Sequence, residues 1–343
     1  MRLESSVTSV SWIPRDAVEG LTRYPFDLGL AHYDLPPPDR LTDLGGLLQR
    51  SEVRFANELR AFIEVRDGRI VDYGQTGRGH MGHTHMRVAG RGVDFAGVSF
   101  PDLRGAPEVR ADSVRFTQTV GGRAGMPVPR RVRRPPFVQL AAPTVWSTLA
   151  LTIRTDGSSA FEVVGASSFP RHWIYDHEGR LAAKTGYIDY DTWYRESFGE
   201  RNPWGDEESP AIVTAVESAL ERRLSLVIIG SDPPFRRLRP GDTLVEQGEH
   251  GDELFLLFDG VLQVVRDGQP VVEVGPGAIL GEMALLEGRH RRTATLRAVT
   301  PCRVAVVPGD RVDRAALEEI ARSRGASGPP TAPQAEEEHQ RIE

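Results

Sequence analysis

The chain of 343 residues contains a single cysteine, Cys302, which excludes an intramolecular disulfide and any zinc site built from several cysteines. No apolar run reaches the length of a membrane-spanning helix, and no apolar stretch follows the basic residue near the start. We therefore expect neither a signal peptide nor a membrane anchor. The net charge of −6 gives no global electrostatic reason to bind nucleic acid. These absences predict a cytoplasmic protein that contacts neither DNA nor membrane.

The composition is that of a globular protein, with 39% hydrophobic and 26% charged residues. A chain of this length exceeds what one hydrophobic core usually supports, so we expect two domains with tails. The shifts in composition predict an irregular segment over 1–50, a β-rich domain of unknown function over 51–205, a second domain over 206–322 and a disordered tail over 323–343.

The stretch from 51 to 205 consists of short alternating or β-branched runs with little helical periodicity. Asp67-Gly68 and Asp156-Gly157 stand between such runs as hairpin turn signals. This pattern predicts an antiparallel β barrel or sandwich.

Three histidines of this domain, His80, His83 and His85, are candidate metal ligands. Alternate residues of a strand share a face, so His83 and His85 could bind one metal together with His80. The alternative is a polar strand edge whose histidines form ordinary hydrogen bonds. No carboxylate lies nearby in the sequence to complete a metal site.

The second domain is expected to be a small β-roll with flanking helices. Ser209-Pro210 combines a favoured N-cap with proline at the first helical position, which predicts a helix from Ser209 to Leu226. Short strands with frequent glycines follow from Arg236 to Val307, and Val312 to Ala321 has a helical pattern. The predicted fold class is therefore mostly β: an N-terminal antiparallel barrel or sandwich and a C-terminal jelly-roll-like β-roll.

One segment of the roll combines residues suited to binding an anionic sugar phosphate. It reads Gly281-Glu282-Met283-Ala284-Leu285, then six residues, then Arg292-Thr293-Ala294. An arginine together with backbone N–H groups at a turn or helix start holds an anion well. Gly281 lets the backbone approach a ligand, the Glu282 carboxylate can accept a hydroxyl proton, and Thr293 adds a hydroxyl.

These residues resemble the cyclic-nucleotide-binding domain family, whose phosphate-binding cassette has the form Gly-Glu-(Leu/Met)-(Ala/Gly)-Leu, a short spacer and Arg-(Ser/Thr/Ala)-Ala. The resemblance extends upstream to Arg239-Pro240-Gly241-Asp242, to Gln247-Gly248-Glu249-His250-Gly251-Asp252 and to the run 254–260, so it covers the C-terminal third. The six-residue spacer is similar to that of the bacterial catabolite-activator branch.

The resemblance implies a ligand, cAMP more than cGMP, and no further cofactor. By matching position, Glu282 would bind the ribose 2′-hydroxyl, Arg292 the phosphate, and Thr293 the phosphate or the base. The remaining cassette positions would contribute backbone groups or line the ligand pocket: Gly281, Met283, Ala284 and Ala294. Arg291 is an alternative phosphate ligand, but the Thr-Ala that follows Arg292 sets the register and favours Arg292.

The expected function is that of a sensor in which nucleotide occupancy of the roll regulates the N-terminal β domain. A transcription factor is disfavoured because only 31 residues follow Val312 and no basic recognition helix is visible. Two alternatives stay open: a nucleotide-gated enzyme with a small-molecule or metal site in the N-terminal domain, and a structural protein carrying a nucleotide-binding module. The sequence favours a protein that is not an enzyme, and it leaves a homodimer or an unidentified partner protein as possible alternatives.

Overall fold

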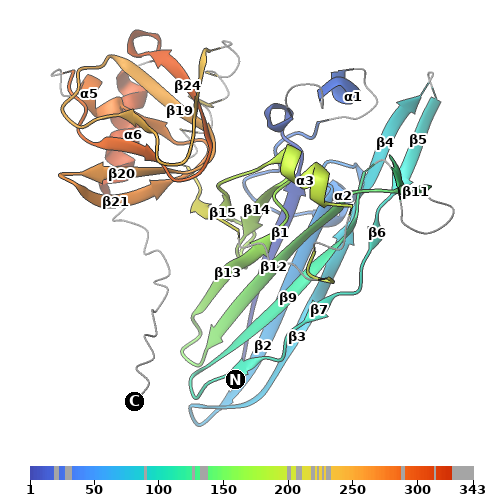
Figure 1. Cartoon of the computed structure of the whole chain (residues 1–343). Helices are drawn as coiled ribbons and strands as arrows, with labels where there is room; N and C mark the ends of the chain where they lie inside the picture. Colours follow the sequence, from blue (N-terminus) through green and yellow to red (C-terminus); the bar gives the residue numbers. More distant parts are fainter. Residues whose placement is uncertain are drawn as a thin grey trace, which may run out of the picture. The chain divides into compact units, whose positions relative to one another are not determined.

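The computed structural model describes residues 1–18, 23–27, 33–88, 91–125, 128–131, 138–198, 202–205, 211–217, 221, 224–225, 228, 233–286, 290–312 and 314–326. The chain forms two compact units, Met1–Val216 and Glu217–Glu343. Figure 1 colours the first from blue to yellow and the second in orange and red. The units divide later than the boundary expected after residue 205.

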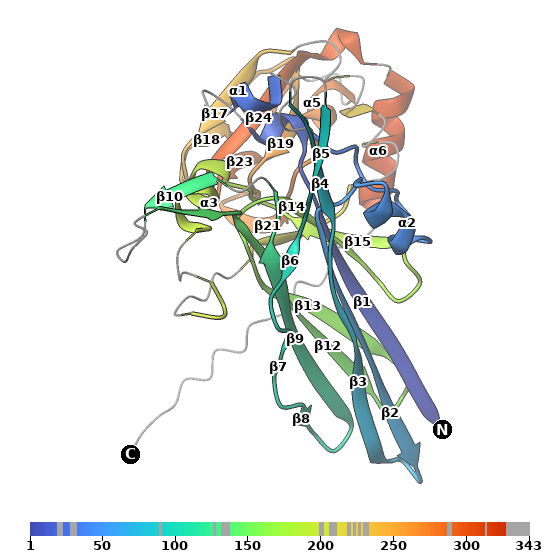
Figure 2. The same cartoon turned by 90° about the vertical axis from the view of Figure 1, so that its right-hand side faces the viewer.

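The first unit is built on two antiparallel sheets. One has the strand order β16-β15-β14-β1-β2-β3, and the other has the order β13-β12-β9-β6 with β7 and β8 also paired to β9. Figure 2 shows their long strands running side by side. The strands of the first sheet are β1 (Arg2–Trp12), β2 (Phe55–Arg66), β3 (Arg69–Met81), β14 (Arg171–Tyr175), β15 (Leu181–Thr185) and β16 (Val213–Ala215). Those of the second are β6 (Val98–Ser99), β7 (Leu103–Arg104), β8 (Glu108–Val109), β9 (Ser113–Arg123), β12 (Thr144–Arg154) and β13 (Ser159–Ala166).

Shorter elements surround these sheets. Strand β4 (His83–Val88) pairs with β5 (Arg91–Ala96), and β10 (Val128–Arg131) pairs with β11 (Val138–Ala141). The helical elements are η1 (Arg15–Ala17), α1 (Tyr24–Asp27), α2 (Leu44–Gln49) and α3 (Tyr190–Glu196).

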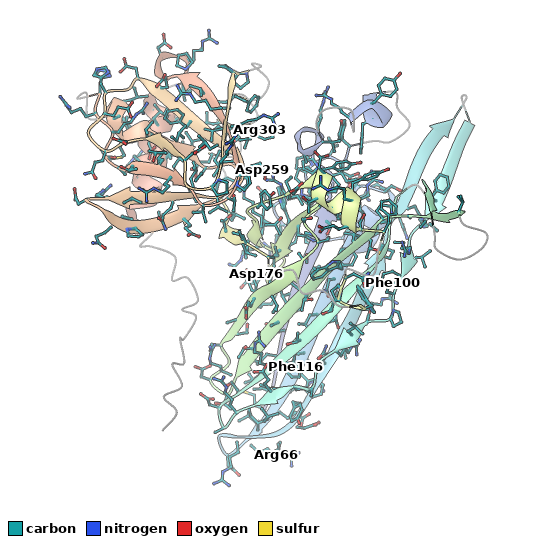
Figure 3. All side chains as sticks on the ribbon, viewed as in Figure 1. Arg66, Phe100, Phe116, Asp176, Asp259 and Arg303 are labelled. Atoms are coloured by element: carbon teal, nitrogen blue, oxygen red, sulfur yellow. The ribbon has the colours of Figure 1, made fainter. Side chains whose placement is uncertain are left out.

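The two sheets pack face to face around one apolar core. Val7 and Leu59 from the first sheet cluster with Phe116 and Leu149 from the second, and all four are fully buried. Figure 3 labels Phe116 within this unit. Apolar side chains from both sheets thus share one interior, as in a β-sandwich. The expectation of an antiparallel β domain is confirmed.

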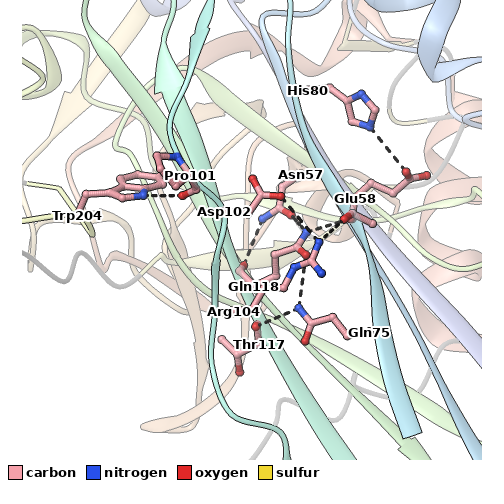
Figure 4. Close-up of polar contacts among 11 residues, drawn as sticks. Asn57, Glu58, Gln75, His80, Pro101, Asp102, Arg104, Thr117, Gln118 and Trp204 are labelled. Carbon is pink, nitrogen blue, oxygen red and sulfur yellow. Dashed lines mark hydrogen bonds and ion pairs between the residues drawn. The ribbon is translucent and has the colours of Figure 1, made fainter.

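A polar layer interrupts the apolar interior of the sandwich. Asn57 on β2 donates to the Ser147 carbonyl on β12 at 2.9 Å, and Gln118 on β9 donates to Asn57 Oδ1 at 2.9 Å. All three residues are fully buried, and Figure 4 shows Asn57 and Gln118 side by side. Because buried amides need hydrogen-bond partners, this layer ties the two sheets together at one level.

The expectation of an irregular segment over 1–50 is wrong for its first residues. Strand β1 lies between β14 and β2 in the sheet. Its buried positions include small hydroxyl side chains such as Ser5, Ser9 and Ser11, which break the apolar alternation by which strands are recognised. Ser5 and Ser11 are hydrogen-bonded inside the unit.

The predicted start of the helix over 209–226 is also wrong in part. Val213–Ala215 is strand β16, which pairs with β15 at the edge of the first sheet. Hydrophobic periodicity cannot distinguish a strand from a helix over only three residues. Pairing with β15 at the edge of the sheet therefore determines the structure here. Ser209-Pro210 lies outside the described residues, whereas Glu221, Leu224, Ser225 and Ile228 are helical.

The second unit contains two four-stranded antiparallel sheets, with orders β17-β24-β19-β22 and β18-β23-β20-β21. Its elements are β17 (Phe235–Leu238), β18 (Thr243–Val245), β19 (Glu253–Asp259), β20 (Leu262–Arg266), β21 (Gln269–Val274), β22 (Ile279–Leu280), α5 (Glu282–Leu286), β23 (Thr295–Ala298), β24 (Cys302–Pro308), η3 (Gly309–Arg311) and α6 (Arg314–Ala326). The predicted β-roll is confirmed.

Strand β19 is buried on both faces. Phe255 and Leu257 join the core between the sheets, while Leu254 and Leu256 join a second cluster that includes Leu317 of α6. The second predicted helix is therefore present as α6. It continues to Ala326, so the expected disordered tail begins with four helical residues, and 327–343 lie outside the described part. No helix among the described residues is long and apolar enough to cross a membrane.

Candidate functional site

The cassette begins where β22 meets α5. Gly281 stands between them with φ +90°, and Glu282 is the first residue of α5 and is buried. A Cβ on Gly281 would lie 2.7 Å from Arg292 Nη1 and 3.0 Å from the Glu253 carbonyl oxygen. Glycine is needed here for two reasons: the left-handed backbone, and the guanidinium that occupies the side-chain space.

Arg292 is the most unusual residue of the site, because its charged side chain is only 3% exposed. Its Nη1 donates to the Glu253 carbonyl at 2.8 Å, and its Nη2 donates to Glu253 Oε2 at 3.2 Å. The guanidinium lies over the Phe255 ring at 4.9 Å from the centroid. Burial lowers the pKa of Arg292, although a guanidinium stays cationic near neutral pH.

One donor of this guanidinium is left over. Arg292 Nε is buried and has no hydrogen-bond partner within the described part of the chain. Leaving a buried donor unpaired, above all on a charged group, costs free energy. The arrangement is therefore suited to an anion that binds at this side of Arg292.

The loop before β19 lies along the other side of the Arg292 side chain and backbone. Gly248 N donates to the Arg292 carbonyl and Arg292 N donates to the Glu249 carbonyl, both at 2.8 Å. A Cβ on Gly251 would lie only 2.3 Å from Arg292 Nη2. Gly251 and Glu253 are site residues that the sequence analysis did not identify. The Gly-Asp-Glu run was visible, but nothing in its spacing places it against Arg292.

The neighbouring Arg291 points elsewhere. It is exposed, and its Nη1 donates to the Gly248 carbonyl at 2.8 Å. Of the other cassette positions, Ala284 is buried, and three are partly buried: Met283, Thr293 and Ala294. Geometry thus brings Arg292, rather than Arg291, against Gly281.

The three candidate metal ligands of the first unit, His80, His83 and His85, do not form a cluster among the described residues. His80 lies on β3 with Nε2 3.7 Å from Glu58 Oε2, and this contact, followed by Arg60, lowers the pKa of Glu58 to about 2 (Figure 4). His83 is exposed on β4, and the His85 side chain is outside the described set. No group of three His, Cys, Asp or Glu side chains suited to a metal occurs in the described residues. A metal at these positions stays a prediction.

Comparison with known proteins places the C-terminal third in a family. Residues 235–319 match the family model described as cyclic nucleotide-binding domain. A cGMP-dependent protein kinase of Caenorhabditis briggsae is 34% identical over 89 residues, which are 26% of this chain and 11% of the kinase. The human potassium/sodium hyperpolarization-activated cyclic nucleotide-gated channel 2 is 34% identical over 92 residues, 27% of this chain and 10% of the channel.

Among solved structures, a cyclic nucleotide-binding-like protein of Brucella abortus is 25% identical, with a TM-score of 0.22, covering 29% of this chain and 84% of that one. The chain spans about a tenth of the length of the kinase and of the channel. No family model matches the first unit. The sequence motif, the roll and the family match agree: the C-terminal third of this chain contains a cyclic nucleotide-binding domain.

Proposed function

We propose that the C-terminal domain binds cAMP in preference to cGMP and that its occupancy regulates the N-terminal sandwich. The observation that carries the proposal is the buried guanidinium of Arg292, whose Nε lacks a hydrogen-bond partner in the described residues. The ring phosphate of a cyclic nucleotide is an anion that satisfies such a donor and balances its charge.

Glu282 supports the sugar part of the proposal. Its carboxylate is buried at the start of α5, one residue after the glycine that contacts Arg292. A carboxylate accepts hydrogen bonds from hydroxyl groups, as the ribose 2′-hydroxyl requires. The preference for cAMP rests on the six-residue spacer, which resembles that of the catabolite-activator branch.

Two contacts connect the cassette to helices outside the roll. Leu285 and Leu286 of α5 pack in one cluster with Leu317 of α6. On the side where the chain arrives from the first unit, Glu221 Oε1 accepts from Ile279 N at 3.4 Å. A ligand that binds one arrangement of these helices more tightly than another shifts their populations, and regulation takes this form.

Calorimetric titration of the full chain with cAMP and cGMP tests the proposal. We expect binding near micromolar, about −8 kcal/mol, with cAMP tighter than cGMP. Arg292→Ala removes charge-assisted bonds worth roughly 1.5–3 kcal/mol each, so its affinity should fall by about tenfold to several hundredfold. Glu282→Ala should show a smaller loss.

Arg291→Ala is the matched control, because it removes an adjacent arginine that is exposed and bound to the Gly248 carbonyl. It should bind nearly as the wild type does. Absence of binding by folded wild-type protein would sink the proposal, and equal loss in Arg291→Ala and Arg292→Ala would reassign the phosphate ligand.

A further inference from the structure

The carboxylate of Glu253 lies between two arginines. Its Oε2 is 3.2 Å from Arg292 Nη2, and its Oε1 is 3.8 Å from Arg236 Nη2 on β17. The two cations differ in exposure: the Arg292 side chain is 3% exposed and that of Arg236 is 50% exposed. Glu253 itself is 43% exposed, so its carboxylate has room to favour either arginine.

A phosphate bound by Arg292 would meet this carboxylate as a neighbour. The guanidinium has five N–H donors in a planar fork. The Glu253 carbonyl takes one on Nη1 and its carboxylate takes one on Nη2, whereas Nε has no partner among the described residues. An anion that uses the Nε side therefore shares one cation with a second anion, and two negative charges this close repel each other.

We propose that Glu253 sets the nucleotide affinity of this domain by competing with the phosphate for Arg292, and that Arg236 relieves the competition by attracting the same carboxylate. This inference rests on the proposed nucleotide binding, and it concerns a residue outside the Gly281–Ala294 cassette.

The opposite role, in which the Glu253 carboxylate holds Arg292 in place for the ligand, is less consistent with the contacts. Arg292 is already fixed by the Glu253 backbone carbonyl and by the Phe255 ring. It is confined further by Gly251 and Gly281, whose missing side chains leave space only for the guanidinium. Neutralising the carboxylate leaves all of these contacts intact, so the arginine should keep its position.

The test is a calorimetric titration of full-length Glu253→Gln with cAMP and cGMP. Glutamine keeps the size of the side chain and an acceptor for Nη2 but removes the negative charge. Since the group is partly exposed and screened, we expect binding tighter by about three- to thirtyfold. The matched control is Glu273→Gln, which removes one charge from an exposed position on β21 and should bind as the wild type does.

A second variant moves the affinity in the opposite direction without changing Arg292 or Glu253. Arg236→Gln leaves the carboxylate to Arg292 alone, so binding should weaken by about two- to fivefold in the wild-type background. In the Glu253→Gln background the same substitution should have little effect, and this double-mutant cycle isolates the coupling of the two residues.

The outcomes separate this inference from the function on which it rests. If the wild type binds nucleotide and Glu253→Gln binds it equally or more weakly, the proposed competition by Glu253 is overturned, and nucleotide binding itself stands. An equal effect of Arg236→Gln in both backgrounds overturns the role of Arg236. No binding by either the wild type or Glu253→Gln overturns the proposed function and this inference together.

Discussion

Two arginines, one in each unit, are buried to the same extent and differ in how their charge is balanced. Arg54 and Arg292 are each 4% exposed. Arg54 forms a bidentate ion pair with Asp34, with Nη2–Oδ1 at 2.9 Å and Nε–Oδ2 at 3.0 Å, and Asp34 is itself buried. Arg292 instead shares a half-exposed carboxylate with Arg236 and leaves Nε unpaired within the described residues.

The difference bears on the proposed role of Arg292. The Arg54–Asp34 pair holds the segment around residue 34 to the ends of two strands, because Arg54 directly precedes β2 and Asp34 Oδ2 also accepts from Ile13 N, directly after β1, at 2.7 Å. This ion pair gives Arg54 a buried counter-charge within the protein. Arg292 Nε has no partner within the described residues, and the phosphate of the proposed ligand would supply one.

The largest effect is expected when the partner of Arg54 is removed. Asp34→Ala leaves Arg54 buried without its counter-charge, which should lower the free energy of unfolding by about 3–5 kcal/mol. All five tryptophans precede residue 217, so tryptophan fluorescence during urea unfolding follows the first unit. Glu4→Gln, which removes an exposed partner of Arg2, is the control and should change little. A loss below about 1 kcal/mol would contradict the structural role.

A second prediction concerns how the sandwich responds to acid. His172 is fully buried, its Nδ1 lies 2.7 Å from Ser11 Oγ, and desolvation lowers its pKa to about 4. In the unfolded chain this histidine is protonated near pH 6.5, whereas in the folded chain it stays neutral until about pH 4. The free energy of unfolding therefore decreases as pH falls from 6.5 towards 4. The loss should reach about 3 kcal/mol.

Urea unfolding at pH 7.5 and pH 5, again followed by tryptophan fluorescence, measures the first part of this loss, about 2 kcal/mol. The difference in the free energy of unfolding between these two pH values should be smaller in His172→Gln. If the variant loses as much stability as the wild type over this range, other groups cause the pH dependence. Glu58, whose folded pKa is lowered to about 2, stabilises the fold in full above its ordinary pKa, so its contribution is lost only at pH values below this range.

The smallest predicted effect concerns the glycine that lies against Arg292. In Gly251→Ala the new Cβ would lie 2.3 Å from Arg292 Nη2, so the guanidinium must shift. We expect nucleotide affinity to fall by about tenfold, or about 1.4 kcal/mol. Gly105→Ala, where the nearest atom to the new Cβ is Thr117 Cβ at 3.7 Å, is the control. Unchanged binding by Gly251→Ala would mean that the position of Arg292 does not limit affinity.

The cassette was predictable because its residues are close in sequence. Gly281, Glu282 and Arg292 lie within one short segment whose spacing is specific. Frequent glycines also mark the turns between the strands of the roll. The carboxylate at Glu253 was not predictable in the same way. Its contact with Arg292 spans 39 residues and depends on the course of β19 and of the loop before it.

The sandwich was predictable as a class of fold and not in its details. Hairpin signals and alternating runs identified an antiparallel β domain, but serines at buried positions of β1 hid a strand that lies inside the sheet. At β16 the pairing with β15 outweighed an apparent helical pattern. In both cases tertiary contacts decided the local structure, and one sequence does not display them.

The Asn57–Gln118 pair has a consequence for how the sandwich strands align. A shift of β2 by two residues would keep its apolar side chains facing inward, so an all-apolar interior would discriminate poorly against it. It would also move Asn57 away from the Ser147 carbonyl and bring Phe55 or Leu59 to the level of Gln118. Each amide group left unpaired costs roughly 1–3 kcal/mol. The pair therefore penalises misaligned strands, and the long strands of this unit have one preferred alignment.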